Sequence, residues 1–397
     1  MRTIVEQKRT ERKESMLDFL AREGARKMLT EALDEEVTLF LERRRYVRAK
    51  LEAKGYRNGV RERKLTVLGT SLSIPVQKLE GAAFHSSLLR PYQRRSDGVD
   101  ELFRRLYVEG LSSRDFEPAL RALLGTESTL SSSTILRLSQ QFQKDLDVFM
   151  RRDLSKSRYA YVWADGVYLK AGLEKENTAL LVLVGVNAKG TKELIAVLEG
   201  YRESRESWRE ILRDVAERGM AAPKLVIGDG IAGLWEAVAE VYPHAKDQRC
   251  WKHKMRNVLD KVPKAKEEEV LAWLRRAYEA DKRADAEIIL AELAVHLEDR
   301  YPKAAACVRK DQEALLRYFD FPKAHWVHLK TTNPIESIFA GVRLRTRVVR
   351  RFQRSKTGVA FVFKVLERLA YFWSPIENPE ALGVVLEKPI KALAKAA

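Results

Sequence analysis

Cysteine and long apolar runs are scarce in this sequence, and acidic residues are outnumbered by basic ones. Two cysteines, Cys250 and Cys307, exclude a disulfide framework and favour a reducing compartment. The longest nearly uncharged apolar run, residues 178–188, is too short to span a bilayer. Residues 1–8 lack the apolar stretch of a signal peptide. We therefore expect a cytoplasmic protein without a membrane segment.

An excess of Lys and Arg over acidic residues makes the chain strongly basic. Lys and Arg number 73 against 56 Asp and Glu among 397 residues, which gives a net charge of +17 and a pI near 9.7. Such an excess favours a polyanionic partner, nucleic acid before membrane, and hence a location at the nucleoid. The hydrophobic fraction of 45% excludes a disordered chain, and the length of 397 residues allows two or three domains.

Changes in pattern divide the chain. Residues 1–54 have helical periodicity, and residues 61–67 and 71–77 alternate like a β-hairpin whose second strand Pro75 confines to an edge or ends early. Residues 98–145 resemble three capped helices, which fit either a helix-turn-helix DNA reader or an ordinary helical domain. We expect an N-terminal DNA-binding or dimerisation region over 1–97, a helix-turn-helix-like domain over 98–155, a catalytic domain over 156–260 and 329–375, an all-helical insertion over 261–328, and a tail over 376–397.

The middle of the chain predicts an α/β fold. Strands are expected over 159–170, 179–186, 193–199 and 224–228, and helices over 206–217 and 232–241. A mixed sheet covered by helices is the simplest arrangement of these elements. The block from 264 to 320 has only helical periodicity and is locally acidic, so we expect an insertion that does not bind nucleic acid.

Three carboxylates are candidates for chemistry. Asp165 and Asp229 are each followed by glycine at what the pattern suggests are strand ends, and Glu336 lies in the first turn of a helix after Asn333-Pro334. Each one alone fits an ordinary turn or helix-start residue. Together they could bind two Mg²⁺ ions, because that cation prefers hard oxygen ligands. Two such metal ions side by side can hold the attacking and leaving oxygens of a phosphodiester.

A basic run follows Glu336. From residue 337 to 366 there is no acidic residue, whereas a solvated face would carry both signs. Helical spacing places Arg343 and Arg347 on the face of Glu336 and Arg345 elsewhere. We expect DNA phosphates to contact Arg343, Arg347, Arg350, Arg351 and, beside Asp165, Lys170.

Cys250 and His253 form a Cys-x-x-His pair, and His325 and His328 form a second pair after the helical block. The four could make a zinc site, but their spacing matches no standard zinc module. We predict a structural role and no zinc: Cys250 closes a strand, and His253 opens a helix into the insertion.

An ordered set of motifs resembles the mutator-type transposases of bacterial insertion sequences. The resemblance covers roughly residues 50–375 and rests on Gly55-Tyr-Arg-Asn-Gly59, Tyr107-x-x-Gly110-Leu-Ser-Ser-Arg114, Asp165-Gly-Val-Tyr-Leu-Lys170, Ile227-Gly-Asp229-Gly, Gln248-Arg-Cys250-x-x-His253, Thr331-Thr-Asn-Pro-Ile-Glu336 and Val342-Arg-x-Arg-Thr-Arg347.

The resemblance implies an RNase H-like catalytic domain with an all-helical insertion, a DDE transposase. It makes Asp165, Asp229 and Glu336 the catalytic and metal-binding triad, and Cys250 and His253 a family signature of uncertain role. The implied reaction is Mg²⁺-dependent DNA cleavage at element ends and strand transfer to target DNA, with two ions expected and Mn²⁺ able to replace them. The implied partners are the terminal inverted repeats, target DNA and a second copy of the chain, since two ends must be handled together.

Two rival functions need separate tests. A non-catalytic DNA-binding regulator would use the same basic helices, and only metal-dependent nicking of DNA would distinguish it. A carboxylate-pair hydrolase acting on sugars would need a neutral or acidic cleft, which the basic charge disfavours.

Overall fold

The computed structural model describes residues 16–47, 54–67, 70–111, 132–169, 178–200, 202–349, 352 and 354–387. These residues form two compact units, one of residues 1–107 and 111–138 and the other of residues 108–110 and 139–397. Within the described ranges, no helix has the length and apolar character needed to cross a membrane.

The first unit contains one long helix and a hairpin. Helix α1 (Met16–Leu41) packs its Leu33 side against strands β1 (Tyr56–Val67) and β2 (Thr70–Glu80), where Leu65, Leu72 and Ile74 are buried. The strands are antiparallel, with Glu62 opposite Pro75. The hairpin prediction is confirmed. Of the two expected effects of Pro75, the edge strand is confirmed and the early end is not: β2 continues to Glu80, because each strand of a two-stranded sheet has an outer edge free of ladder bonds.

Two helices follow the hairpin in sequence, α2 (Asp97–Val108) and α4 (Ser132–Met150). They correspond to the first and third helices expected for a helix-turn-helix. The second expected helix, beginning near Ser112, lies outside the described residues. The helix-turn-helix interpretation therefore remains a prediction.

The second unit is built on a five-stranded sheet of order β5-β4-β3-β6-β7. Its strands are β3 (Tyr159–Leu169), β4 (Thr178–Asn187), β5 (Lys192–Gly200), β6 (Leu225–Gly228) and β7 (Lys246–Arg249). The pairs β3–β4 and β4–β5 are antiparallel, whereas the pairs β3–β6 and β6–β7 are parallel. The prediction of a mixed sheet is confirmed.

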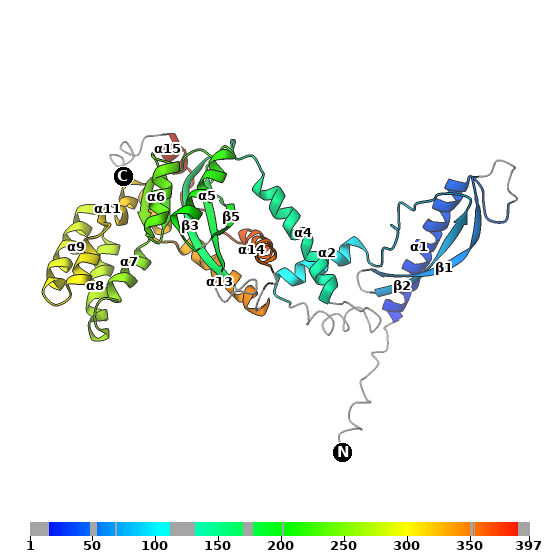
Figure 1. Cartoon of the computed structure of the whole chain (residues 1–397), viewed down its shortest axis with the longest axis horizontal. Coiled ribbons are helices and arrows are strands. Elements are labelled where there is room, and N and C mark those ends of the chain that lie inside the picture. The colour runs from blue at the N-terminus through cyan, green and yellow to red at the C-terminus, as the bar shows by residue number, and fades with distance from the viewer. Residues whose placement is uncertain are drawn as a thin grey trace, which may run out of the picture. The chain divides into compact units, whose positions relative to one another are not determined.

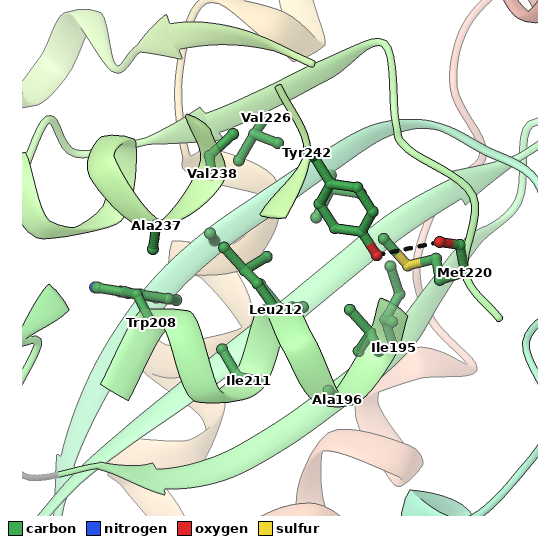
Figure 2. Packing of buried hydrophobic residues seen from close by; sticks show 14 of the residues in the cluster. Ile195, Ala196, Trp208, Ile211, Leu212, Met220, Val226, Ala237, Val238 and Tyr242 are labelled. Carbon is green, nitrogen blue, oxygen red and sulfur yellow. Dashed lines mark hydrogen bonds between the residues drawn. The ribbon is translucent and has the colours of Figure 1, made fainter. Parts of the chain in front are cut away.

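Helices α5 (Arg205–Glu217) and α6 (Ala232–Val241) cover one face of this sheet. Figure 2 shows Trp208, Ile211 and Leu212 of α5 packed with Ala237 and Val238 of α6 and with sheet residues. The Tyr242 hydroxyl donates a hydrogen bond to the Met220 carbonyl at the rim of this core. Burial of this continuous apolar layer supplies most of the driving force for the fold.

The long block between the sheet and Glu336 is helical, as predicted. It follows α7 (Trp251–Leu259) and contains α8 (Glu267–Glu279), α9 (Arg283–Glu298), α10 (Pro302–Arg309), α11 (Gln312–Leu315), α12 (Trp326–Leu329) and three short 3₁₀ segments, Lys264–Lys266, Arg317–Asp320 and Lys323–His325. Figure 1 shows α8 and α9 in yellow tones, away from the strands. The chain then returns through α13 (Asn333–Val349), α14 (Ser355–Ala370) and α15 (Ala381–Glu387).

Candidate active site

Asp165 and Asp229 lie on neighbouring parallel strands. Strand β3 pairs with β6 so that Trp163 lies opposite Ile227. Asp165 comes two residues after Trp163, and Asp229 comes two residues after Ile227. Asp229 follows the end of β6, as predicted. Asp165 does not end its strand, because β3 continues to Leu169 and Asp165 pairs with Val182 of β4. The expected strand over 159–170 is therefore confirmed, whereas the placement of Asp165 at a strand end is wrong.

The Asp229-Gly230 turn is fixed by hydrogen bonds. The Ile231 amide donates to Asp229 Oδ1 at 3.0 Å, and Arg249 Nη1 donates to the Gly230 carbonyl at 3.0 Å. Gly230 has φ +90°, and a Cβ atom there would lie 1.3 Å from Arg249 Nη1. The positive φ favours glycine here, and the turn holds the Asp229 carboxylate beyond the sheet.

Glu336 returns to the sheet because the insertion begins and ends at the same place. The Cys250 amide donates to the Gly228 carbonyl at 2.8 Å, and the Trp251 amide donates to the Lys330 carbonyl at 2.9 Å. The residues that enter and leave the insertion are thus directly bonded. Helix α13 starts three residues after Lys330 and carries Glu336 in its first turn.

Glu336 contacts the Cys-x-x-His motif. The Thr332 hydroxyl donates to Glu336 Oε1 at 2.6 Å, and its amide donates to Cys250 Sγ at 3.3 Å. His253 Nδ1 lies 3.7 Å from Glu336 Oε1. Among the described residues, the ligand atoms of Cys250, His253 and Glu336 all lie within 4.8 Å of one another. The three acidic residues do not form such a tight group by themselves.

The expected positions of Cys250 and His253 are confirmed. Cys250 directly follows β7, and His253 lies in the first turn of α7. The second histidine pair lies elsewhere: the Tyr161 hydroxyl donates to His325 Nδ1 at 2.7 Å, and the Glu377 amide donates to His328 Nε2 at 3.2 Å. His325 and His328 therefore do not complete a four-ligand zinc site with the first pair.

The electrostatics show that several acidic groups share this region. Burial raises the pKa of Asp165 to about 7, and the negative charges of Glu203 and Asp229 raise it as well. Contact with the Cys250 thiol raises the pKa of His253 to about 9, with further contributions from Glu336 and Asp229. His253 in turn lowers the pKa of Asp165. His253 is therefore within electrostatic reach of all three acidic residues.

Glu203 is a fourth acidic residue at the site that the sequence analysis missed. A Cβ atom at Gly166 would lie 2.5 Å from Glu203 Oε1, so Gly166 leaves the room that Glu203 occupies. Burial raises the pKa of Glu203, and the charge of Asp229 adds to the increase. The sequence signal was weak, since an acidic residue just before the Ser204 N-cap of α5 is common.

The arginines after Glu336 differ in their environment. Arg343 and Arg347 are exposed on α13. Arg345 instead forms an ion pair with Glu109 at 2.9 Å, and Arg368 bonds the other oxygen of the same carboxylate. The expectation that Arg345 faces away from Arg343 and Arg347 on the helix is therefore confirmed. Lys170, Arg350 and Arg351 lie outside the described residues, so their expected DNA contacts stay predictions.

A second basic surface lies in the first unit. A hollow beside β1 and the start of α2 is lined by basic side chains with a few acidic ones among them. Its basic residues are Arg61, Arg63, Lys64, Arg90, Arg94, Arg95, Arg104 and Arg137. A basic concave surface of this kind is suited to a phosphate backbone.

Comparisons with known proteins agree with one another. The model of the family described as "Transposase, Mutator family" matches residues 1–375. The transposase for insertion sequence element IS6120 of Mycolicibacterium smegmatis is 45% identical over 72% of this chain and 89% of that protein. The transposase for IST2 of Acidithiobacillus ferrooxidans is 40% identical over 66% and 90%, and that for ISRM5 of Rhizobium meliloti is 32% identical over 86% and 85%.

Among solved structures, one chain in the structure of a simian T-cell lymphotropic virus intasome in complex with PP2A regulatory subunit B56 gamma is similar over 54% of this chain and 65% of its own length. The sequence identity is 12% and the TM-score is 0.19, so no argument rests on that similarity.

Proposed function

The chain belongs to the Mutator family of transposases, and from that premise we propose that it cleaves DNA at insertion-sequence ends and joins them to target DNA. The proposed catalytic residues are Asp165, Asp229 and Glu336. The observation that carries the proposal is the parallel pairing of β3 with β6, which makes Asp165 and Asp229 neighbours. The closed insertion then returns Glu336 to the same region.

The side chains at this site fit Mg²⁺. Asp165, Asp229 and Glu203 bring carboxylates together, and their mutual repulsion contributes to the raised pKa values of Asp165 and Glu203. A divalent cation would relieve that repulsion, and hard oxygen ligands are those that Mg²⁺ prefers. Asp165, Asp229 and Glu336 would hold two Mg²⁺ ions, or Mn²⁺ in their place. Bound there, the ions supply Lewis acidity at a scissile phosphodiester.

The chain's own residues position the DNA. The exposed guanidinium groups of Arg343 and Arg347 follow Glu336 along α13 and are suited to phosphates near the reacting bond. The basic hollow of the first unit is suited to further backbone contacts with the element's inverted repeats. Arg249 holds the Asp229-Gly230 turn through its hydrogen bond to the Gly230 carbonyl.

The sheet supports an RNase H-like arrangement for the catalytic domain. Three antiparallel strands are followed by two strands parallel to β3, and the acidic residues lie on the middle strand and its parallel neighbour. We further propose that the protein acts as a homodimer at the nucleoid, because two element ends must be processed together.

A cleavage assay on DNA carrying the element's inverted repeats tests this function. The wild-type chain should nick the repeat ends with Mg²⁺ and be inactive with EDTA. Asp165→Ala, Asp229→Ala and Glu336→Ala should each abolish nicking while leaving DNA binding largely intact, since binding rests on Lys and Arg. Asp260→Asn, an exposed C-cap position on α7, is the matched control and should cleave normally.

Two results would contradict the proposal. Cleavage that persists in all three alanine variants would exclude the triad. Tight binding of the inverted repeats without any nicking in Mg²⁺ or Mn²⁺ would favour a non-catalytic DNA-binding regulator.

A further inference from the structure

Three side chains of different chemistry face one another at the edge of the proposed active site. We propose that Cys250, His253 and Glu336 form a binding site for a thiophilic divalent cation, with Zn²⁺ as the preferred ion. Their ligand atoms all lie within 4.8 Å of one another. Sequence spacing left Cys250 and His253 as half a site, and the fold supplies the third ligand.

The distances suit a metal better than a hydrogen bond. His253 Nδ1 and Glu336 Oε1 are 3.7 Å apart, which is too long for a hydrogen bond. Two ligands of a tetrahedral zinc ion lie about 3.3–3.8 Å apart, given metal–ligand distances of about 2.0–2.3 Å. The buried Nδ1 atom meets no partner in hydrogen-bond geometry. A cation between the ligands would satisfy it.

The burial and surroundings of the three residues support the same conclusion. Cys250 is fully buried, whereas the side chains of His253 and Glu336 are 29% and 32% exposed. The thiol forms the floor, and the other two ligands lie at the open side. The Thr332 amide and hydroxyl lie 3.3 and 3.2 Å from Cys250 Sγ, the kind of outer contact that orients a metal-bound thiolate.

The identity of the ligands selects the cation. A thiolate and an imidazole favour Zn²⁺ over Mg²⁺, which prefers oxygen ligands alone. Three protein ligands leave the fourth tetrahedral position open to water. Because Glu336 belongs to both sites, zinc would withdraw it from the acidic triad. This inhibitory consequence rests on the proposed function, whereas zinc binding itself does not.

Metal binding by the full-length protein is the first test. The metal-free chain should bind one equivalent of Zn²⁺, and Co²⁺ in its place should give thiolate-to-metal charge-transfer absorption. Cys250→Ser should abolish that band and weaken zinc binding by more than about 100-fold, since even outer-shell changes cost about 10–100-fold. Cys307→Ser is the matched control and should leave both unchanged.

A folding control is needed for the variants, because a misfolded chain would also lose metal binding. Circular dichroism should show that Cys250→Ser and His253→Asn keep the helical content of the wild type. Absence of the thiolate band in folded wild-type protein, or its loss in Cys307→Ser alone, would overturn the proposal.

Cleavage of inverted-repeat DNA is the second test. Zinc should inhibit Mg²⁺-dependent nicking by the wild type, and Cys250→Ser should require at least about 100-fold more zinc for the same inhibition. If no variant nicks DNA but zinc binding follows Cys250, the proposed function fails and the zinc site stands. If Cys250→Ser were inhibited by the same zinc concentration as the wild type, zinc would not inhibit by withdrawing Glu336 from the acidic triad.

Discussion

Gly166 and Glu203 form a pair in which the absence of one side chain makes room for another. Any Cβ atom at Gly166 would collide with the Glu203 carboxylate, so the two positions constrain each other. Glycine in the interior of a strand weakens the strand, which makes its presence here informative. The room it leaves brings a fourth negative charge to Asp165 and Asp229.

Replacing Glu203 with Gln should therefore weaken Mg²⁺ binding several-fold. The change keeps the size of the side chain and removes one charge that raises the pKa of Asp165. The measurement is the shift in unfolding temperature caused by added Mg²⁺. Glu206→Gln, an exposed position in the first turn of α5, should behave like the wild type. Equal shifts in both variants would show that Glu203 does not act on the cation.

His325 makes a pH-dependent contribution to stability. Burial lowers its pKa, and the neutral ring accepts from the Tyr161 hydroxyl and donates to the Asn378 carbonyl. In the unfolded chain the His325 ring takes up a proton at about pH 6.5. The stability due to neutral His325 is therefore present above that pH and is lost as the pH falls below it.

His325→Gln tests this dependence. At pH 8 the variant should be less stable by about 1–3 kcal/mol, because buried polar groups lose their partners. Between pH 7 and pH 5 the difference from the wild type should shrink. The measurement is denaturant unfolding across that range, with exposed His296→Gln as the control. A difference that is constant with pH would mean that His325 does not remain neutral in the folded protein.

At the level of helices and strands, α13 joins Glu336, a proposed catalytic residue, to a basic surface. Replacing both Arg343 and Arg347 with Gln should weaken DNA binding and reduce the salt slope by about 1.8, or about 0.9 for each phosphate contact. Titration of labelled DNA at several salt concentrations measures this. Arg345→Gln should instead leave the slope unchanged and lower stability, because it breaks the Glu109 ion pair. An unchanged salt slope in the double variant would mean that α13 does not bind DNA phosphates, and the basic hollow beside β1 would become the better candidate.

The strands and helices of the second unit were largely predictable, because buried strands such as β4 and β6 are short apolar runs with clear ends. The role of Asp165 within its strand was not, since Asp-Gly normally signals a turn. The contact between Cys250 and Glu336 also escaped prediction. It depends on where the long insertion closes, and no local pattern encodes that closure.

At the scale of the whole molecule, each unit has its own buried core. Ile74 is fully buried among Leu33, Leu65 and Leu72 in the first unit, while the second unit is organised around Trp208 and Leu212. Ile74→Ala should cost about 2–5 kcal/mol through the cavity it leaves.

Calorimetry should show that loss as a lower unfolding temperature for one transition only. The transition of the second unit should stay where it is in the wild type, since its core is untouched. Ile288→Ala, at an exposed position on α9, is the control. A single transition that moves as a whole would show that the two cores unfold together.

The order of the acidic residues along the chain matters for synthesis. Asp165 and Asp229 leave the ribosome first, and Glu336 emerges only after the entire insertion has been translated. If all three are needed, a nascent chain or a product of premature termination before residue 333 carries the sheet and the basic N-terminal region but cannot break DNA. If so, translation itself delays DNA cleavage until the whole insertion and the start of α13 have been made.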